Sequence, residues 1–319
     1  MIVTVTVNPS IDVTLSTSSF AIGKVNRAHD VRRDPAGKGV NVARALARHG
    51  VEATAIYPAD ASYGRDLSTM LDAAGVRAAS APILQPIRTN ITVVDTRTGC
   101  TTKINEPGPA LSSGEKKTLT ELIGRHVAST PRWLVACGSI PPGLGTDFYT
   151  ELGTLALRFG VPLAVDTSGA PLRAIVAAGT ATLIKPNLEE LEELLGHSLA
   201  TVGDVVRGTR KLLRLPDARA LVSLGEQGAL LVTASASWWA GAPAVVPLST
   251  VGAGDSALAG YLAASDATPA QRLATAVAWG TAAVQLPGSE APGPCSLRIN
   301  DVTVVENPHP HLPIGELST

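Results

Sequence analysis

Ser249-Thr-Val-Gly-Ala-Gly-Asp-Ser256 is a glycine-rich loop that leads directly into the helical pattern Ala257–Ala264. Its two glycines allow the backbone to turn tightly, so that the amides that follow converge at the start of the helix. Unpaired N–H groups and the positive end of the helix dipole favour an anion there, with the dipole contributing roughly 0.3–1 kcal/mol per charge. The stretch therefore predicts a phosphate bound beside the carboxylate of Asp255.

The same loop also matches a dinucleotide-binding fingerprint, Gly252-x-Gly254-x-x-Ala257. Only helical patterns follow it, however, and no acidic residue ends a second strand about 20 residues later. Asp255 would also place a carboxylate against a pyrophosphate, where like charges repel. A carboxylate beside a bound phosphate is better suited to take a proton from an attacking hydroxyl, so the loop favours phosphoryl transfer over nicotinamide chemistry. A role for Asp255 as a plain helix N-cap stays open.

Short apolar runs alternate with helix-length segments through the rest of the chain. The expected strands are Ile2–Val7, Ala53–Tyr57, Trp133–Cys137, Leu163–Asp166, Thr182–Lys185 and Ala220–Leu224, and the expected helices include Val40–Arg48, Arg65–Ala74 and Pro269–Val284. Helices with buried strands between them predict an α/β fold with a mostly parallel sheet covered on both faces. We expect residues 1–319 to form a single domain.

Two segments, residues 12–33 and 87–105, alternate polar and apolar residues instead. This period predicts antiparallel hairpin strands outside the main sheet, a small lid suited to closing over a substrate or to contacting a second subunit. The proline-rich tail from Glu306 is expected to be loosely held, with His309 and His311 exposed to solvent.

The composition of the 319 residues excludes several classes of protein. Twenty-six basic and 27 acidic residues leave a net charge of −1, and only 3% of residues are aromatic, which argues against a nucleic-acid partner. The longest charge-free stretch, 227–254, is interrupted by glycine and proline, so no membrane span and no leader segment are expected. Three cysteines without CxxC spacing indicate reduced thiols in a cytoplasmic protein.

Three further segments carry weaker signals. Pro35-Ala-Gly-Lys-Gly-Val-Asn41 is not a Walker A loop, but two glycines around a lysine suit the close approach of an oxyanion or a sugar. Asn187-Leu-Glu-Glu190 reads mostly as a helix-capping pattern. Ser223-Leu-Gly-Glu-Gln-Gly228 predicts a strand–turn–strand that could support the phosphates or ribose of a nucleotide.

Taken in order, these segments resemble the PfkB branch of the ribokinase-like sugar kinases over nearly the whole chain. The resemblance rests on Gly37–Asn41, Leu183–Asn187 with Glu190, Val222–Ala229 and Ser249–Asp255, and the opening Thr6-Val-Asn-Pro-Ser-Ile-Asp12 is similar to the members that phosphorylate sugar phosphates. It implies a ribokinase-like three-layer sandwich with a small antiparallel β lid, and a phosphotransferase that uses ATP and Mg²⁺.

The resemblance also implies roles for matching residues. Asp255 would be the catalytic base, and the amides of Gly252, Ala253 and Gly254 would form the anion hole. Asn187 and Glu190 would hold Mg²⁺ indirectly, through water. The nucleotide would be bordered by Lys185, Asn187, Ser223, Gly225, Glu226, Gly228 and Thr250. The sugar hydroxyls would be held by Asp12, Gly37, Gly39 and Asn41.

A phosphate on the sugar itself would need cations, and here the resemblance gives conflicting signals. Lys38, Arg88, Asn90 and Ser139 match substrate-side positions, and Lys38 favours the groups that phosphorylate fructose 1-phosphate or tagatose 6-phosphate over the minor 6-phosphofructokinase. Lys103 and the turn Asn105–Pro109 favour fructose 6-phosphate or tagatose 6-phosphate instead. The leading expectation is fructose 1-phosphate, in a cytoplasmic homodimer joined through the lid strands, with a monovalent cation such as K⁺ near Ser249–Val251. A non-catalytic sugar-phosphate sensor is a distant alternative.

Overall fold

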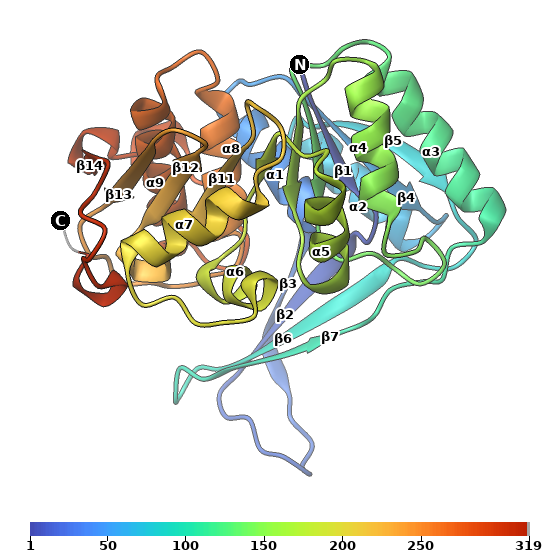
Figure 1. Cartoon of the computed structure of the whole chain (residues 1–319). Helices are drawn as coiled ribbons and strands as arrows, with labels where there is room; N and C mark the ends of the chain where they lie inside the picture. Colours follow the sequence, from blue (N-terminus) through green and yellow to red (C-terminus); the bar gives the residue numbers. More distant parts are fainter. Residues whose placement is uncertain (318–319) are drawn as a thin grey trace.

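A mostly parallel sheet forms the centre of the molecule, as the alternating sequence pattern predicts (Figure 1). The computed structural model describes residues 1–317. Across the sheet the strands are β14 (Thr303–Glu306), β13 (Ser237–Gly241), β12 (Ala229–Thr233), β11 (Arg219–Ser223), β10 (Leu183–Ile184), β9 (Leu163–Asp166), β8 (Trp133–Cys137), β1 (Ile2–Thr6), β4 (Ala53–Ala59) and β5 (Arg77–Pro82). The strands from β11 to β5 pair in parallel, and β12, β13 and β14 add an antiparallel edge.

Helices cover both faces of this sheet, which gives the expected three layers (Figure 1). One face carries α1 (Lys38–Arg48), α2 (Tyr63–Ala73), α8 (Ala253–Ala263) and α9 (Pro269–Val284). The other carries α3 (Ser113–Val127), α4 (Phe148–Arg158), α5 (Gly169–Ala178), α6 (Leu188–Leu195) and α7 (Val202–Leu212). Because both faces are covered, every residue of β1, β8 and β9 is buried, which explains their continuous apolar runs.

The lid is a separate four-stranded sheet of β3 (Ala28–Ala36), β2 (Ser10–Thr17), β6 (Arg88–Asp95) and β7 (Thr101–Asn105), in that order. Each hairpin is antiparallel, as predicted. The two hairpins are joined by parallel pairing of β2 with β6, which the sequence did not predict. Both strands leave the carboxyl ends of parallel strands in the main sheet and therefore run in the same direction, away from the body of the molecule (Figure 1).

The prediction of a loosely held C-terminal tail is wrong for the described residues. The backbone of α7 donates hydrogen bonds to the tail, from Val202 to Leu312 O and from Gly203 to Pro310 O. Ile314 and Leu317 are buried in the core, because the tail carries apolar side chains between its prolines. His309 and His311 are exposed.

The charge-free stretch 227–254 forms β12, β13 and the loop that leads to α8. Within residues 1–317, no helix combines the length and the apolar character that crossing a membrane requires.

Candidate active site

Two adjoining cavities lie at the carboxyl ends of the central strands, where parallel α/β sheets bind ligands. The first, which we call the polar cavity, has a volume of about 410 Å³ and extends from the lid to the start of α8. The second, the apolar cavity, has a volume of about 790 Å³ and lies between β11–β13 and α9. Both are lined by Lys185, Asn187, Ser223, Thr250 and Gly254, so the two cavities meet at these residues.

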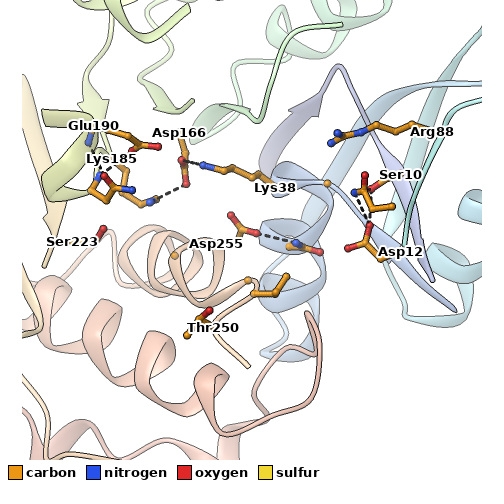
Figure 2. A pocket seen from close by; sticks show the side chains of 17 residues that line it. Ser10, Asp12, Lys38, Arg88, Asp166, Lys185, Glu190, Ser223, Thr250 and Asp255 are labelled. Atoms are coloured by element: carbon orange, nitrogen blue, oxygen red, sulfur yellow. Dashed lines mark hydrogen bonds and ion pairs between the residues drawn. The ribbon is translucent and has the colours of Figure 1, made fainter. Parts of the chain in front are cut away.

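Asp255 lies in the first turn of α8, on the wall of the polar cavity (Figure 2). Gly252 is the N-cap of this helix, with φ +77°, so the alternative of Asp255 as the N-cap is wrong. Asp255 is 6% exposed, and its Oδ2 accepts a 2.8 Å hydrogen bond from Asn41 Nδ2 of α1. Burial, together with the charge of Asp166, raises the pKa of Asp255 to about 6, although Lys38 and Asn41 act in the opposite direction.

The first turn of α8 presents its backbone amides to the same cavity. The intrahelical bonding begins with Ser256 N–H donating to Gly252 O at 2.8 Å. The amides of the preceding turn are therefore available to an anion. Gly252 and Gly254 line the polar cavity, and Ala253 lines the apolar one. A Cβ atom at Gly254 would come within 3.2 Å of Lys185 Nζ, so glycine lets this lysine approach the helix.

Asp166 holds two lysines at the centre of the site (Figure 2), a feature that the sequence analysis missed. It ends β9 and is 1% exposed. Lys38 Nζ lies 2.6 Å from Asp166 Oδ1, and Lys185 Nζ lies 3.0 Å from Asp166 Oδ2. Burial raises the pKa of Asp166, but the two lysines more than offset this effect and hold it below its ordinary value. The sequence did carry a signal for this residue, because Asp166 is a carboxylate at the carboxyl end of an otherwise apolar strand.

Lys38 therefore lies apart from its predicted partner, Arg88. Its ammonium group faces Asp166, whereas Arg88 lies on the lid side of the cavity (Figure 2). Burial lowers the pKa of Lys38, but the charges of Asp166 and Asp255 outweigh burial and raise it above its ordinary value. Lys38 is thus a permanent cation at the centre of the site. It pairs with Asp166 and also lines the polar cavity with Arg88, so its role in reading the sugar's own phosphate stays a prediction.

The lid side of the polar cavity holds a cluster of polar side chains from β2 and β6. Asp12 Oδ1 accepts hydrogen bonds of 2.9 Å from both Ser10 Oγ and Asn90 Nδ2. Asn90 also donates to Ser10 Oγ at 3.0 Å. Ser10 was not predicted, although its spacing from Asp12 places both on one face of β2. Arg88 lies next to this cluster and donates to Glu106 O at 3.1 Å.

Three other predicted substrate residues lie outside the cavity lining. Lys103 is exposed on β7, in register with Thr92 of β6. Gly39 packs against β1, where a Cβ atom would come within 2.5 Å of Thr6 Oγ1, so it serves the close packing of α1. Ser139 follows β8, is exposed, and accepts a hydrogen bond from Asn8. Gly37 and Asn41 do line the polar cavity.

All the predicted nucleotide residues line at least one of the two cavities. Ser223, Gly225, Glu226 and Gly228 form the predicted strand–turn–strand, in which Leu224 N–H donates to Gly228 O at 2.9 Å. The apolar walls of this cavity were not predicted and include Trp239, Pro243, Pro247, Val277 and Val284. These residues are scattered along the chain and form no motif, so sequence spacing gave no signal for them.

Asn187 and Glu190 form a capping box at the start of α6. Asn187 Oδ1 accepts from Glu190 N–H at 2.7 Å, and Glu190 Oε2 accepts from Asn187 N–H at 2.9 Å. The capping interpretation is therefore confirmed. Both residues also line the polar cavity, so the box places one remaining carboxylate oxygen beside it.

The model of the pfkB family of carbohydrate kinases matches residues 4–294. The chain belongs to this family. It is 36% identical over 291 residues to the 1-phosphofructokinase of Rhodobacter capsulatus, covering 88% of this chain and 89% of that protein. It is 35% identical over 259 residues to the ATP-dependent 6-phosphofructokinase isozyme 2 of Mycobacterium tuberculosis, covering 81% of this chain and 76% of that one.

Among solved structures, phosphofructokinase-2 from Escherichia coli in complex with potassium superposes with a TM-score of 0.86 at 32% identity, covering 92% of this chain and 96% of that one. The ribokinase-like α/β fold and the assignment as a sugar kinase, a phosphotransferase, follow from these comparisons together with the family match.

Proposed function

We propose that this pfkB kinase transfers the terminal phosphoryl group of ATP to a ketohexose monophosphate, with fructose 1-phosphate converted to fructose 1,6-bisphosphate. The observation that carries the proposal is the position of Asp255, a buried carboxylate oriented by Asn41 at the start of α8. The amides that would hold the transferring group precede it directly in the chain. Relatives named 1-phosphofructokinase at 32–36% identity support the choice of acceptor.

Asp255 acts as the general base in this account. It accepts the proton of the sugar hydroxyl as the hydroxyl oxygen forms its bond to the γ-phosphorus and the bond to the ADP oxygen breaks. A pKa of about 6 leaves Asp255 mostly ionised at neutral pH, yet basic enough to take the proton. The amides of Gly252, Ala253 and Gly254, together with Lys38 and Lys185, stabilise the negative charge of the transferring group.

The residues around Glu190 fit an indirectly held Mg²⁺. Within residues 1–317, no group of three or more histidine, cysteine, aspartate or glutamate side chains is arranged to enclose a metal. Mg²⁺ is commonly held by one or two protein oxygens, waters and the substrate's phosphates. One oxygen of Glu190 borders the polar cavity and the amide of Asn187 borders the junction of the two cavities, and both would hold it through water. When bound, Mg²⁺ neutralises charge on the ATP phosphates.

The acceptor binds on the lid side of the polar cavity. Asp12, Asn90 and Asn41 offer a carboxylate and two amides to the sugar hydroxyls, and Arg88 offers a guanidinium to the acceptor's phosphate. The apolar cavity takes the adenine of ATP between Trp239, Val277 and Val284, and Ser223, Gly225, Glu226, Gly228 and Thr250 border its ribose and phosphates.

The outer face of the lid supports a homodimer. Leu15 of β2, Ile91 of β6 and Ile104 of β7 share one face by register, opposite the face that carries Asp12 and Asn90. Ile104 is 57% exposed. A second copy of the lid would bury this apolar face. Light scattering should therefore give twice the mass of one chain, and Ile104→Asp should give monomers; a monomeric wild-type protein would contradict the dimer.

Two further features belong to this proposal. The three cysteines are free thiols, and we place the reaction in the cytoplasm, where thiols remain reduced. K⁺ is expected to bind near Ser249–Val251, which precedes the anion hole, and to raise the rate relative to a sodium buffer.

The product identifies the reaction: ³¹P NMR after incubation with Mg-ATP and fructose 1-phosphate should show ADP and fructose 1,6-bisphosphate. Hydrolysis of ATP without a new sugar phosphate would contradict the proposal.

A further inference from the structure

Asn8 joins three separate segments beside the acceptor's side of the site. It follows β1, belongs to the opening Asn8-Pro9 motif, and is 4% exposed. Its Nδ2 donates to Pro107 O at 3.0 Å and to Ser139 Oγ at 3.1 Å. These partners lie in the turn after β7 and in the loop after β8. One buried amide thus ties the lid to two strand ends of the main sheet.

The chemistry of these contacts fixes the direction of each hydrogen bond. Pro107 has no N–H and offers only a carbonyl, so the amide nitrogen of Asn8 must face it. The same nitrogen donates to Ser139, whose oxygen therefore acts as the acceptor. Within the described chain this hydroxyl makes no other hydrogen bond, so the Ser139 proton is free to be donated to an anion.

The turn that Asn8 holds also orients Arg88. Glu106 O accepts from Arg88 Nη1 at 3.1 Å, and Glu106 Oε2 accepts from Thr89 N–H at 2.8 Å. Pro107, the next residue, is the one that Asn8 holds. The side-chain amide of Asn8 therefore acts on two residues. It contacts Ser139 directly, and it orients Arg88 through the turn that contains Glu106 and Pro107.

The contact between Asn8 and this turn is unusually close. Gly108 has a φ of +91°, and a Cβ atom there would come within 2.1 Å of Asn8 Oδ1. Among residues 1–317, no donor satisfies this buried oxygen. An unsatisfied buried acceptor lowers stability. The turn thus packs directly against the side chain of Asn8.

We propose that Asn8 is a positioning residue that sets Ser139 and Arg88 to read the phosphate of the acceptor sugar. The inference rests on the proposed function, since it requires an acceptor that carries a phosphate. Arg88 lines the polar cavity, whereas Asn8 and the exposed Ser139 lie outside its lining, so Asn8 acts through these two partners. Its effect should therefore be confined to binding of the sugar phosphate.

The test compares steady-state kinetics of wild type and Asn8→Asp. Aspartate has the same shape, but its carboxylate cannot donate to Pro107 O. We expect the KM for fructose 1-phosphate to rise about tenfold or more, with the KM for ATP within about twofold. Asn307→Asp makes the same change where the side-chain oxygen accepts from Ser237 N–H at 3.1 Å, far from the site, and should leave both KM values unchanged.

Two further variants keep the test decisive. In Gly108→Ala the added Cβ would displace the turn from the Asn8 side chain. This variant should show the same selective rise in the KM for fructose 1-phosphate, and it can be measured even if Asn8→Asp is too unstable for kinetics. Adding Asn8→Asp to Ser139→Ala should cost less than adding it to wild type, because part of its effect passes through Ser139.

Equal rises in both KM values, or an unchanged KM for fructose 1-phosphate in folded Asn8→Asp and Gly108→Ala, would overturn the inference and leave the proposed function intact. A wild-type protein that phosphorylates no sugar phosphate would overturn the proposed function itself, and the inference with it.

Discussion

Asn41 Nδ2 donates a 2.8 Å hydrogen bond to Asp255 Oδ2 across 214 positions of the sequence. The bond connects α1, which begins within the Gly37–Asn41 motif, to α8, which begins within the motif Ser249–Asp255. It thereby joins the two motif-bearing helices at the carboxylate of Asp255. Because an amide that donates to a carboxylate favours the ionised form, Asn41 keeps a buried aspartate available as a base.

Replacing Asp255 by asparagine should abolish most of the activity while the fold is kept. The variant retains the size of the side chain but cannot take a proton, so kcat should fall at least 10²–10⁴-fold, the range typical of a general base. Coupled ADP release measures this effect, and circular dichroism verifies the fold. Turnover near the wild-type value would remove Asp255 from its proposed role.

The activity should depend on the ionisation of Asp255. With a pKa of about 6, kcat/KM should rise as the pH increases through 6 and then level off. Asn41→Ala removes a hydrogen bond that lowers this pKa, so its pH profile should shift to higher pH. The pH dependence of kcat/KM in both proteins tests this. Superimposed profiles would show that Asn41 does not stabilise the charged form.

The same pKa predicts that the wild-type protein gives up stability at neutral pH. Its folded value of about 6 exceeds the unfolded value of 3.8, so folded Asp255 retains a proton that the unfolded chain releases between these values. Stability contributed by this group is therefore complete below pH 3.8 and is lost as the pH rises through 6. Asp255→Asn should therefore melt at a higher temperature than wild type at pH 7. Its free energy of unfolding should be higher by about 1–3 kcal/mol, and this difference should shrink toward pH 4. A lower melting temperature at pH 7 would contradict this.

Asp166→Asn should both destabilise the protein and slow it. The change leaves Lys38 and Lys185 close together without their shared carboxylate, and breaking a buried pair costs about 3–5 kcal/mol. Chemical denaturation measures the loss. Glu52→Gln breaks a pair with Arg77 that is exposed on both sides and should cost no more than about 1 kcal/mol. Similar losses in the two variants would argue against a central role for Asp166.

Gly254→Ala tests the approach of Lys185 to α8. The added Cβ would come within 3.2 Å of Lys185 Nζ, so the ammonium must move and kcat should fall about tenfold or more. Gly124→Ala in α3 meets no atom within 4 Å and should instead stabilise by about 0.5–1 kcal/mol without changing the rate. Unchanged turnover in Gly254→Ala would show that Lys185 acts independently of this contact.

Features local in sequence were predictable, and contacts between distant segments were not. Trp133–Cys137 and Leu163–Asp166 matched their strands because buried parallel strands are almost entirely apolar, with Asp166 the exception at the end of β9. The predicted nucleotide residues lie in short contiguous motifs. The pairing of Lys38 with Asp166 spans 128 positions, and spacing along the chain carries no information about such a contact. Likewise, the parallel pairing of β2 with β6 depends on where their strands leave the main sheet.

The preferred acceptor is the central claim, and one comparison tests it most directly. Coupled ADP release with Mg-ATP gives kcat/KM for fructose 1-phosphate, fructose 6-phosphate and tagatose 6-phosphate under the same conditions. The account predicts the highest value for fructose 1-phosphate by at least about tenfold, a difference of 1.4 kcal/mol in transition-state binding. A higher value for either 6-phosphate would contradict it.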